Sequence, residues 1–254
     1  MSNDDRESWP SSAERFETAR PRARSEGFPK RVAATFSFLL GCIPRRKAGR
    51  RTLGVLTILM AFVGVALLSY PFVTDFWAHS RQSKLKNELH SKQSIEAFRS
   101  HTIAVGGALT RLIIPKFSGC ASCKGVNVIV VQGTSGNALR AGAGHYVDTP
   151  LPGEQGNVAI AGHRTGFGEP FRHIDALRPG DLIILDTPIG KFTYKVVPPF
   201  DGHGNPWVTN PLDFSVVAPT PEAALTLTSC DPPHTSKNRL IVRADLVQSA
   251  IPTG

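Results

Sequence analysis

The stretch LTLTSC at residues 225–230 alternates leucine and serine with threonine and cysteine, a period of two in residues that favour strands. Asp231 and two prolines follow at once. Because proline cannot donate to a strand ladder, the strand is predicted to end at Cys230. A second apolar run, RLIV at residues 239–242, comes after a short polar connection. Strands joined this closely are predicted to be neighbours, so the sequence indicates a β-rich domain with Cys230 at a strand end.

A thiol and a guanidinium are predicted to face each other at these two strand ends. Cys230 closes the first strand and Arg239 opens the second. A guanidinium lowers the cost of forming a thiolate and can bind a developing oxyanion, so the pair suits nucleophilic catalysis at a carbonyl. The alternative is a buried core cysteine beside a surface charge, since free cysteines are usually buried.

A histidine lies at a third predicted strand end. Residues 157–165 read NVAIAGHRT, an apolar run that ends in Gly162 and His163. A thiol, an imidazole and a guanidinium at separate strand ends can provide a nucleophile, a proton carrier and an oxyanion binder. Cys230, His163 and Arg239 are therefore the candidate catalytic residues.

These segments resemble the sortases, the cysteine transpeptidases of Gram-positive cell surfaces. The matching segments are TLTSC at residues 226–230, RLIV at 239–242, and AGHRT at 161–165 running on to GEPF at 168–171. GHY at 144–146 and LPGEQGN at 151–157 are similar to class E sortases of high-GC Gram-positive bacteria in particular. The resemblance covers roughly residues 107–247.

The resemblance implies a mainly β fold, the eight-stranded sortase-type β-barrel with a few short helices, preceded by a transmembrane helix. It implies a membrane-anchored transpeptidase that cleaves a C-terminal sorting signal between threonine and glycine through a thioester on Cys230. The signal would be of the Leu-Ala-x-Thr-Gly or Leu-Pro-x-Thr-Gly type. Tyr146, Thr228 and Ser229 are the candidate substrate-binding residues, and no cofactor or metal is implied.

The implied partners are secreted proteins that bear such a signal, with an amine of the peptidoglycan precursor or a pilin lysine as acceptor. Two other functions fit the same residues. A secreted cysteine peptidase would use water as the acceptor, and its product formation would not depend on an amine. A non-catalytic, membrane-tethered β-domain that binds wall polymers would not need Cys230 at all.

The charge pattern points to a membrane and away from nucleic acid. Residues 1–51 carry twelve Lys or Arg against six Asp or Glu, most of the formal net charge of +9. Beside them, residues 53–70 form an uncharged apolar run, continued to residue 73, which at about 1.5 Å per residue nearly spans a bilayer core. The basic cluster at 45–51 predicts a cytoplasmic N-terminus and an external C-terminal domain. A cleaved signal peptide is the alternative, but the apolar run is long for one and no convincing cleavage site follows it.

These features divide the chain into four parts. Residues 1–51 are predicted to be a disordered cytoplasmic tail, 52–73 a single-pass anchor in the cell membrane, 74–104 a stalk or linker helix, and 105–254 the extracellular catalytic domain. The segment 80–100 is polar and helix-favouring, with few well-spaced apolar residues, so a plain spacer is preferred to a docking helix.

Prolines and glycines punctuate short apolar runs in the catalytic domain, which predicts many strands and few helices. Pro188, Ile189 and Gly190 are predicted to form a hairpin turn. The predicted strands lie near 108–114, 126–131, 158–161, 181–186, 191–197, 214–218, 223–230 and 239–247, and the predicted helices at 135–141 and 171–177.

The three other cysteines are not predicted to take part in catalysis. Cys42 lies in the cytoplasmic flank and is interpreted as an inert thiol rather than a lipidation site. Cys120 and Cys123 form a CxxC in a loop, where a local disulfide and two free thiols both fit. A zinc site would need four ligands and no second CxxC exists, and a redox CxxC would open a helix in a βαβ unit.

Other histidines compete with His163 for the role of proton carrier. His234 is close to Cys230 in sequence but lies in the connecting loop, and His145 precedes Tyr146 in a pattern found near the sortase cleft. His173 and His203 are interpreted as surface or capping groups. No histidine pair has metal-ligand spacing with a carboxylate partner, so a metal enzyme is not expected.

Overall fold

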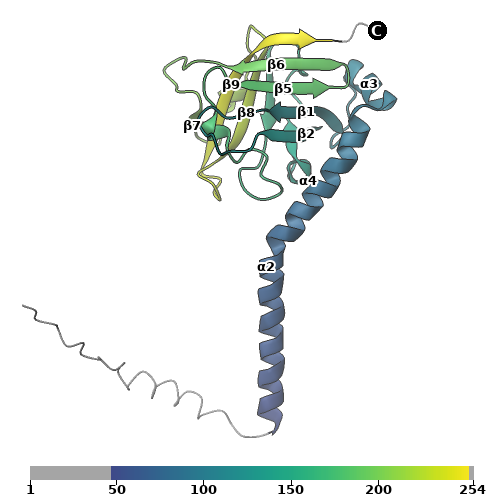
Figure 1. Ribbon diagram of the computed structural model, residues 1–254, viewed down its shortest axis with the longest axis vertical. Helices are drawn as coiled ribbons and strands as arrows, with labels where there is room; N and C mark the ends of the chain where they lie inside the picture. Colours follow the sequence, from purple (N-terminus) through teal and green to yellow (C-terminus); the bar gives the residue numbers. More distant parts are fainter. Residues whose placement is uncertain (1–46, 252–254) are drawn as a thin grey trace, which may run out of the picture. The chain divides into compact units, whose positions relative to one another are not determined.

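The computed structural model describes residues 47–251 of the 254-residue chain. Most of the predicted cytoplasmic tail, and Cys42 with it, lies outside the described residues. Helix α2 (Lys47–Leu89) begins within the predicted tail and runs without a break through the predicted anchor and into the predicted stalk. The chain divides into two compact units, residues 1–61 and 62–254, and all strands among the described residues belong to the second (Figure 1).

The apolar part of α2 exposes its side chains. A window within Thr52–Leu89 has a mean hydropathy of 2.3, and none of it is buried inside the protein. Leu59, Phe62 and Leu68 are exposed by 55%, 70% and 74%. Among residues 47–251 this is the one helix that is long and apolar enough to cross a membrane, which fits the predicted anchor by length and composition.

Eight strands close into a barrel, as predicted (Figure 1). Their order around the ring is β6-β5-β1-β2-β3-β4-β8-β9, and pairing between β6 and β9 closes the ring. The strands are β1 (Ala108–Ile114), β2 (Val126–Gln132), β3 (Ala143–His145), β4 (Asn157–Ala161), β5 (Leu182–Thr187), β6 (Gly190–Val196), β8 (Ala224–Asp231) and β9 (Asn238–Ala250).

Alternating side chains fill the inside of the barrel. Along β6, Phe192, Tyr194 and Val196 are buried, whereas Lys191 and Lys195 are exposed and Thr193 is half-buried, the period of two expected of a strand with one face inward. Leu225 and Leu227 of β8 join the same core cluster. The apolar alternation read from the sequence therefore determines which face of each strand forms the core.

A short 3₁₀ helix, η2 (Phe214–Val217), lies against β4, at the position where the sequence predicted a strand. Thr226 donates to Asn157 Oδ1 at 2.7 Å, and Asn157 Nδ2 donates to the carbonyls of Val216 and Ala218, each at 3.1 Å. The prediction of a strand at 214–218 is wrong because these carbonyls are bound by a side chain from β4 and not by a neighbouring strand.

Two strands were missed because they are too short to show a period. β3 has three residues, and so does β7 (Trp207–Thr209), which lies outside the ring and pairs with the start of β9. The predicted helix at 135–141 is confirmed as α4 (Gly136–Ala141), with Ser135 as its N-cap. The predicted helix at 171–177 is only a 3₁₀ turn, η1 (Ile174–Ala176).

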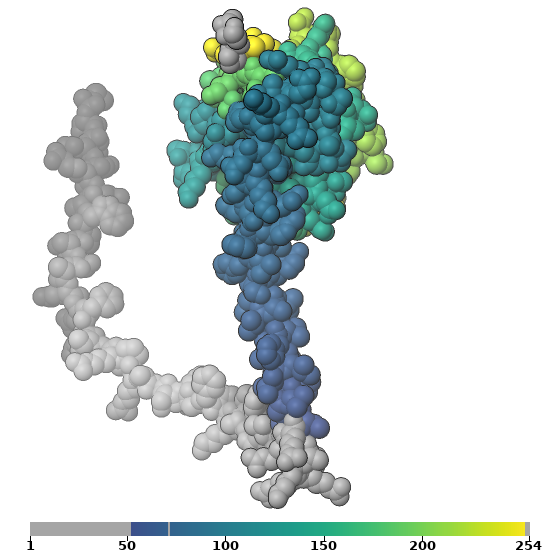
Figure 2. Space-filling model, turned by 90° about the vertical axis from the view of Figure 1, so that its right-hand side faces the viewer, coloured from purple at the N-terminus to yellow at the C-terminus, as the bar shows by residue number. Residues whose placement is uncertain are grey.

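The end of α2 packs on the barrel, so the plain-spacer interpretation is wrong there. Leu85 and Leu89 are buried in a cluster with residues of β1, β2 and α4. Gln82 Nε2 donates to the carbonyls of Ile129 and Ala141 at 3.1 and 2.6 Å, and its Oε1 accepts from the Ile129 N–H at 2.7 Å. The next helix, α3 (Lys92–Arg99), places Phe98 in the main core. Figure 2 shows these blue segments lying over the surface of the domain.

Candidate active site

Cys230 and Arg239 are opposite each other on neighbouring antiparallel strands, as the sequence predicted. Their Cα atoms are partners in the β8–β9 ladder. Residues directly opposite each other in such a ladder project from the same face of the sheet. Cys230 is a free, half-buried cysteine, and Arg239 is also half-buried.

Arg239 is held by its own loop. Its Nη1 donates to the carbonyls of Ser236 and Asn238 at 3.2 and 3.0 Å. A guanidinium has further N–H donors on Nη2 and Nε in a fixed plane. The loop carbonyls therefore orient the group while donors on the same plane can face a ligand.

His163 comes to Cys230 through the parallel pairing of β4 with β8. Past the end of β4, the Gly162 N–H donates to the Thr228 carbonyl at 3.0 Å, and the Ser229 hydroxyl donates to the Gly162 carbonyl at 2.8 Å. His163 and Cys230 are the next residues on the two strands, two positions past the last ladder pair of Ala161 with Thr228. The three candidate catalytic residues are thus gathered at one end of three adjacent strands.

The His163 ring is half-buried and electrostatically biased toward its neutral form. Burial lowers the pKa of His163, and the positive charge of Arg140 lowers it further. The centroid of the His163 ring lies 5.3 Å from the centroid of the Phe167 ring. The guanidinium of Arg140 lies over the same Phe167 ring, 5.6 Å from its centroid. A neutral imidazole can accept a proton, which is what a general base requires.

Gly162 is required by close packing behind the histidine. A Cβ at this position would lie 2.5 Å from a ring carbon of Phe171, which is fully buried. The Phe171 N–H also donates to the His163 carbonyl at 3.0 Å. The aromatic ring and this hydrogen bond fix the path of the chain as it leaves β4.

The candidate substrate-binding residues lie next to the three strand ends. Tyr146, at the end of β3, is half-buried, and its hydroxyl forms a hydrogen bond of 3.2 Å with Thr228 Oγ1. Thr228 and Ser229 are each only 3% exposed. Their side chains join β3, β4 and β8 in this structure, and substrate contact by these residues stays a prediction.

The competing histidines lie in settings that do not resemble that of His163. His145 is fully buried, with ring nitrogens 2.9 Å from Gln132 Oε1 and 3.0 Å from Thr149 Oγ1, and burial lowers its pKa. His234 is exposed in the β8–β9 loop. His173 contacts the Phe117 ring edge-on, and His203 stacks on Trp207.

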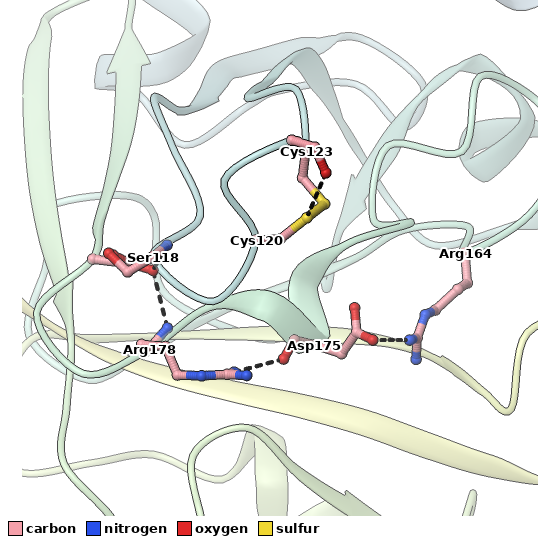
Figure 3. Close-up of a disulfide and its surroundings, with 8 residues drawn as sticks. Ser118, Cys120, Cys123, Arg164, Asp175 and Arg178 are labelled. Carbon is pink, nitrogen blue, oxygen red and sulfur yellow. Dashed lines mark hydrogen bonds and ion pairs between the residues drawn. A yellow bond between two sulfur atoms is a disulfide. The ribbon is translucent and has the colours of Figure 1, made fainter. Parts of the chain in front are cut away.

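The two loop cysteines form a disulfide with each other (Figure 3). Both of them pack against the main core from the loop between β1 and β2. Within residues 47–251 no group of three or more His, Cys, Asp or Glu side chains is arranged to hold a metal ion. Of the two states left open by the sequence, the structure has the local disulfide, and Cys230 stays unbridged.

A groove of about 730 Å³ lies behind the loop that carries His163. Residues of α2, the disulfide loop, β2 and the segment 167–173 line it. Phe167 lines it too, so the groove touches the residue against which the His163 ring packs. Cys230 and Arg239 do not line the groove, so it is separate from the strand ends where the chemistry is predicted.

Sequence reasoning missed an ion pair at the same strand ends. Arg164 Nη1 lies 2.8 Å from Asp231 Oδ1. Each residue directly follows a candidate catalytic residue, His163 or Cys230, on strands that run parallel. Opposite charges at equivalent positions after two strand ends were the signal that could have revealed the pair.

The fold and the site can be compared with known proteins. A model of the sortase domain family matches residues 113–247, more than half of the chain. The chain belongs to the sortase family.

Two curated relatives indicate which sortases the chain is similar to. Sortase SrtE1 of Streptomyces coelicolor is 30% identical over 224 residues, which cover 80% of this chain and 60% of that protein. Sortase SrtE2 of the same organism is 31% identical over 140 residues, 48% of this chain and 52% of that protein. The chain thus spans between half and two thirds of the length of these curated relatives. Both similarities confirm the predicted likeness to class E sortases.

Two solved structures share the fold. The SrtF sortase from Corynebacterium diphtheriae matches with a TM-score of 0.54 and 29% identity, over 60% of this chain and 91% of that chain. The Sortase D5 transpeptidase from Clostridium perfringens matches with a TM-score of 0.54 and 27% identity, over 67% of this chain and 98% of that chain.

Proposed function

We propose that this protein is a cysteine transpeptidase that cleaves a sorting signal and joins the new carboxyl end to an amine. The observation that supports the proposal most is the pairing of Cys230 with Arg239 across β8 and β9, with His163 two residues past the last β4–β8 pair. Family membership supports the class of reaction.

In the first half of the reaction, neutral His163 takes the thiol proton of Cys230, and the resulting thiolate attacks the carbonyl carbon of the scissile peptide bond. Arg239 donates to the carbonyl oxygen as it gains negative charge. When the tetrahedral intermediate collapses, the C–N bond breaks and the departing amine takes a proton from the imidazolium of His163. The donor protein is then held as a thioester on Cys230.

In the second half, an acceptor amine attacks the thioester carbonyl. Neutral His163 takes a proton from the attacking nitrogen, and the C–S bond breaks to restore the Cys230 thiolate. The lowered pKa of His163 favours this step, because the ring is neutral at the start of it. The product is a new amide bond.

The donor is a secreted protein with a C-terminal signal of the Leu-Ala-x-Thr-Gly type, cut between threonine and glycine. The class E likeness supports this choice. The segment after β7 supports an apolar residue in the signal, since Leu212 and Phe214 are exposed by 77% and 70%. That segment follows Thr209, which pairs with Arg239. The acceptor is an amine of the peptidoglycan precursor or a pilin lysine.

The protein acts from the outer face of the cell membrane, held by the apolar part of α2 with its N-terminus in the cytoplasm. The exposed leucines and phenylalanines of α2 and the basic residues before them support this topology. Protease added to intact protoplasts should digest the domain after residue 80 and leave the N-terminal tail. Protection of the barrel domain would show that the orientation is reversed.

The function is tested with the full chain, a signal peptide and an amine acceptor. Wild-type protein should cleave the peptide and form an amide product whose yield rises with amine concentration. Cys230→Ala should do neither while keeping its fold by circular dichroism. Cleavage without amine dependence would indicate a peptidase, and wall binding that persists in a protein without any cleavage would indicate the non-catalytic domain.

A further inference from the structure

Arg164 carries a charge into the interior of the domain beside the proposed active site. Its side chain is only 6% exposed, whereas Arg172 in the same loop is 58% exposed. A guanidinium this deeply buried is stable only when its N–H groups have partners of good geometry. Arg164 therefore makes contacts that a surface arginine does not need.

Those contacts join two carboxylates from different parts of the chain. Nη1 of Arg164 lies 2.8 Å from Asp231 Oδ1, and Nη2 lies 2.8 Å from Asp175 Oδ2. Its Nε donates to the Arg172 carbonyl at 3.2 Å. All three nitrogens of the guanidinium are used, so the group has one orientation, which the compact ammonium of a lysine could not reproduce.

The contact between Arg164 and Asp231 links the two proposed reacting residues through their backbones. Arg164 follows His163 and Asp231 follows Cys230, and one peptide unit separates each member of the ion pair from a reacting residue. The hydrogen-bonded register of β4 and β8 has ended by this point. The ion pair thus continues the attachment of the two strand ends where the ladder no longer holds them.

Asp175, the second carboxylate that Arg164 contacts, is itself held in place by neighbouring residues. Asp175 lies in η1, and its carbonyl accepts from Arg178 Nη1 at 2.8 Å. Asp181 accepts from the backbone N–H groups of Arg178 and Ser118, each at 3.0 Å. Figure 3 shows Arg164, Asp175 and Arg178 joined in a row near the disulfide loop. Arg164 is therefore tied to a part of the domain that is fixed independently of the strand ends.

We propose that Arg164 is a positioning residue for the transfer reaction: by bridging Asp231 and Asp175, it holds His163 and Cys230 in the relative placement that proton transfer requires. This inference rests on the proposed function for its kinetic consequence. The guanidinium also balances the Asp231 carboxylate, which would otherwise be an unpaired negative charge next to the reacting thiolate.

The test compares Arg164→Gln, Asp231→Asn and the double variant, with Arg172→Gln as the matched control. Arg172 lies in the same loop and also forms an ion pair, with Glu169, but that pair is exposed. Each full-length protein is assayed for kcat and KM with a signal peptide, for the rate of Cys230 alkylation by iodoacetamide, and for its unfolding temperature.

Arg164→Gln should lower kcat by about 10²-fold with KM nearly unchanged, because the reacting groups are misplaced after the peptide has bound. Its alkylation should be several-fold slower, since Asp231 is left unbalanced beside the thiolate. Adding Asp231→Asn should restore the alkylation rate but not kcat. Arg172→Gln should match the wild type in kcat and alkylation rate.

A purely structural ion pair would give a different pattern. The inference is overturned if Arg164→Gln keeps wild-type kcat at a temperature where it is folded, or if its loss of activity equals its unfolded fraction. Arg164→Lys, which keeps the charge and one carboxylate contact, gives a second folded variant with an intermediate kcat expected. If the wild type cleaves no signal peptide, the proposed function fails. The alkylation rates then still decide whether Arg164 governs the surroundings of Cys230, and equal rates in all variants would reject it.

Discussion

Replacing Arg239 with lysine keeps the positive charge and removes the planar arrangement of donors. In the structure, Nη1 is bound to the carbonyls of Ser236 and Asn238, which hold the guanidinium at the end of β9 opposite Cys230. A lysine ammonium can reach the same two carbonyls. The ammonium has no second nitrogen in a fixed plane to direct at the substrate. The positive charge therefore stays near the position of the guanidinium, while the N–H donor that points at the substrate oxygen is lost.

The expected loss in kcat/KM is about 10²-fold. Removing one donor from an oxyanion site typically costs about 10²–10³ in rate, roughly 3–4 kcal/mol, and the retained charge puts the lysine variant at the low end of that range. The free energy of unfolding should change by less than about 1 kcal/mol, since Arg239 is half-exposed and its loop carbonyls keep a donor. The loss should therefore appear in the reaction barrier and not in the stability of the fold.

The assay is steady-state cleavage of a signal peptide, with the unfolding temperature of each variant measured in parallel. Arg111→Lys is the control, because Arg111 bonds to Asn127 on the β1–β2 side of the barrel. Arg243 would be a poor control, because its guanidinium lies over the Phe200 ring and donates to the carbonyl of Val216 in η2. Near-normal turnover by Arg239→Lys, or an equal defect in Arg111→Lys, would remove Arg239 from the catalytic set.

Three further outcomes are expected. Leu89→Ala should destabilise the detergent-solubilised full chain by about 2–5 kcal/mol in urea, because Leu89 is fully buried, and an unchanged midpoint would mean that the end of α2 is not docked. The free energy of unfolding should fall as the pH drops below 6.5, because burial lowers the folded-state pKa values of His145 and His163, so the unfolded chain takes up protons first. His145→Gln should weaken this pH dependence, and a stability that rises on acidification would contradict the prediction. Replacing Cys120 and Cys123 together with serine should leave cleavage unchanged and cost about 2 kcal/mol of stability, as expected for so short a closed loop, whereas loss of cleavage would tie the disulfide to the chemistry.

The barrel and the strand ends that carry Cys230, Arg239 and His163 were predictable because they depend on local, periodic signals. Alternation in LTLTSC and the prolines after it gave both the strand and its end, and the structure pairs Cys230 with Arg239 as expected. The apolar run before His163 worked in the same way. Each of these positions is set by a few neighbouring residues in the chain.

The features that were missed depend on contacts between distant segments. Leu85 and Leu89 look like isolated apolar residues in a polar helix until Ile129 and Ala141 are brought beneath them. The strand predicted at 214–218 has suitable residues, yet the amide of Asn157 takes its carbonyls and leaves a 3₁₀ turn. No periodic pattern reports such partners in advance.

Strand β9 has a consequence for the order in which the protein can become active. It pairs with β8 and β7 through its first half and with β6 through its second, so it both seals the ring and carries Arg239. A nascent chain that has exposed everything up to Ser236 would hold the thiol and the imidazole without the guanidinium, on a sheet whose two edges are still unpaired. On the proposed mechanism, acyl transfer needs β9 to be inserted, so a chain that still lacks this strand would not react with the proteins it meets.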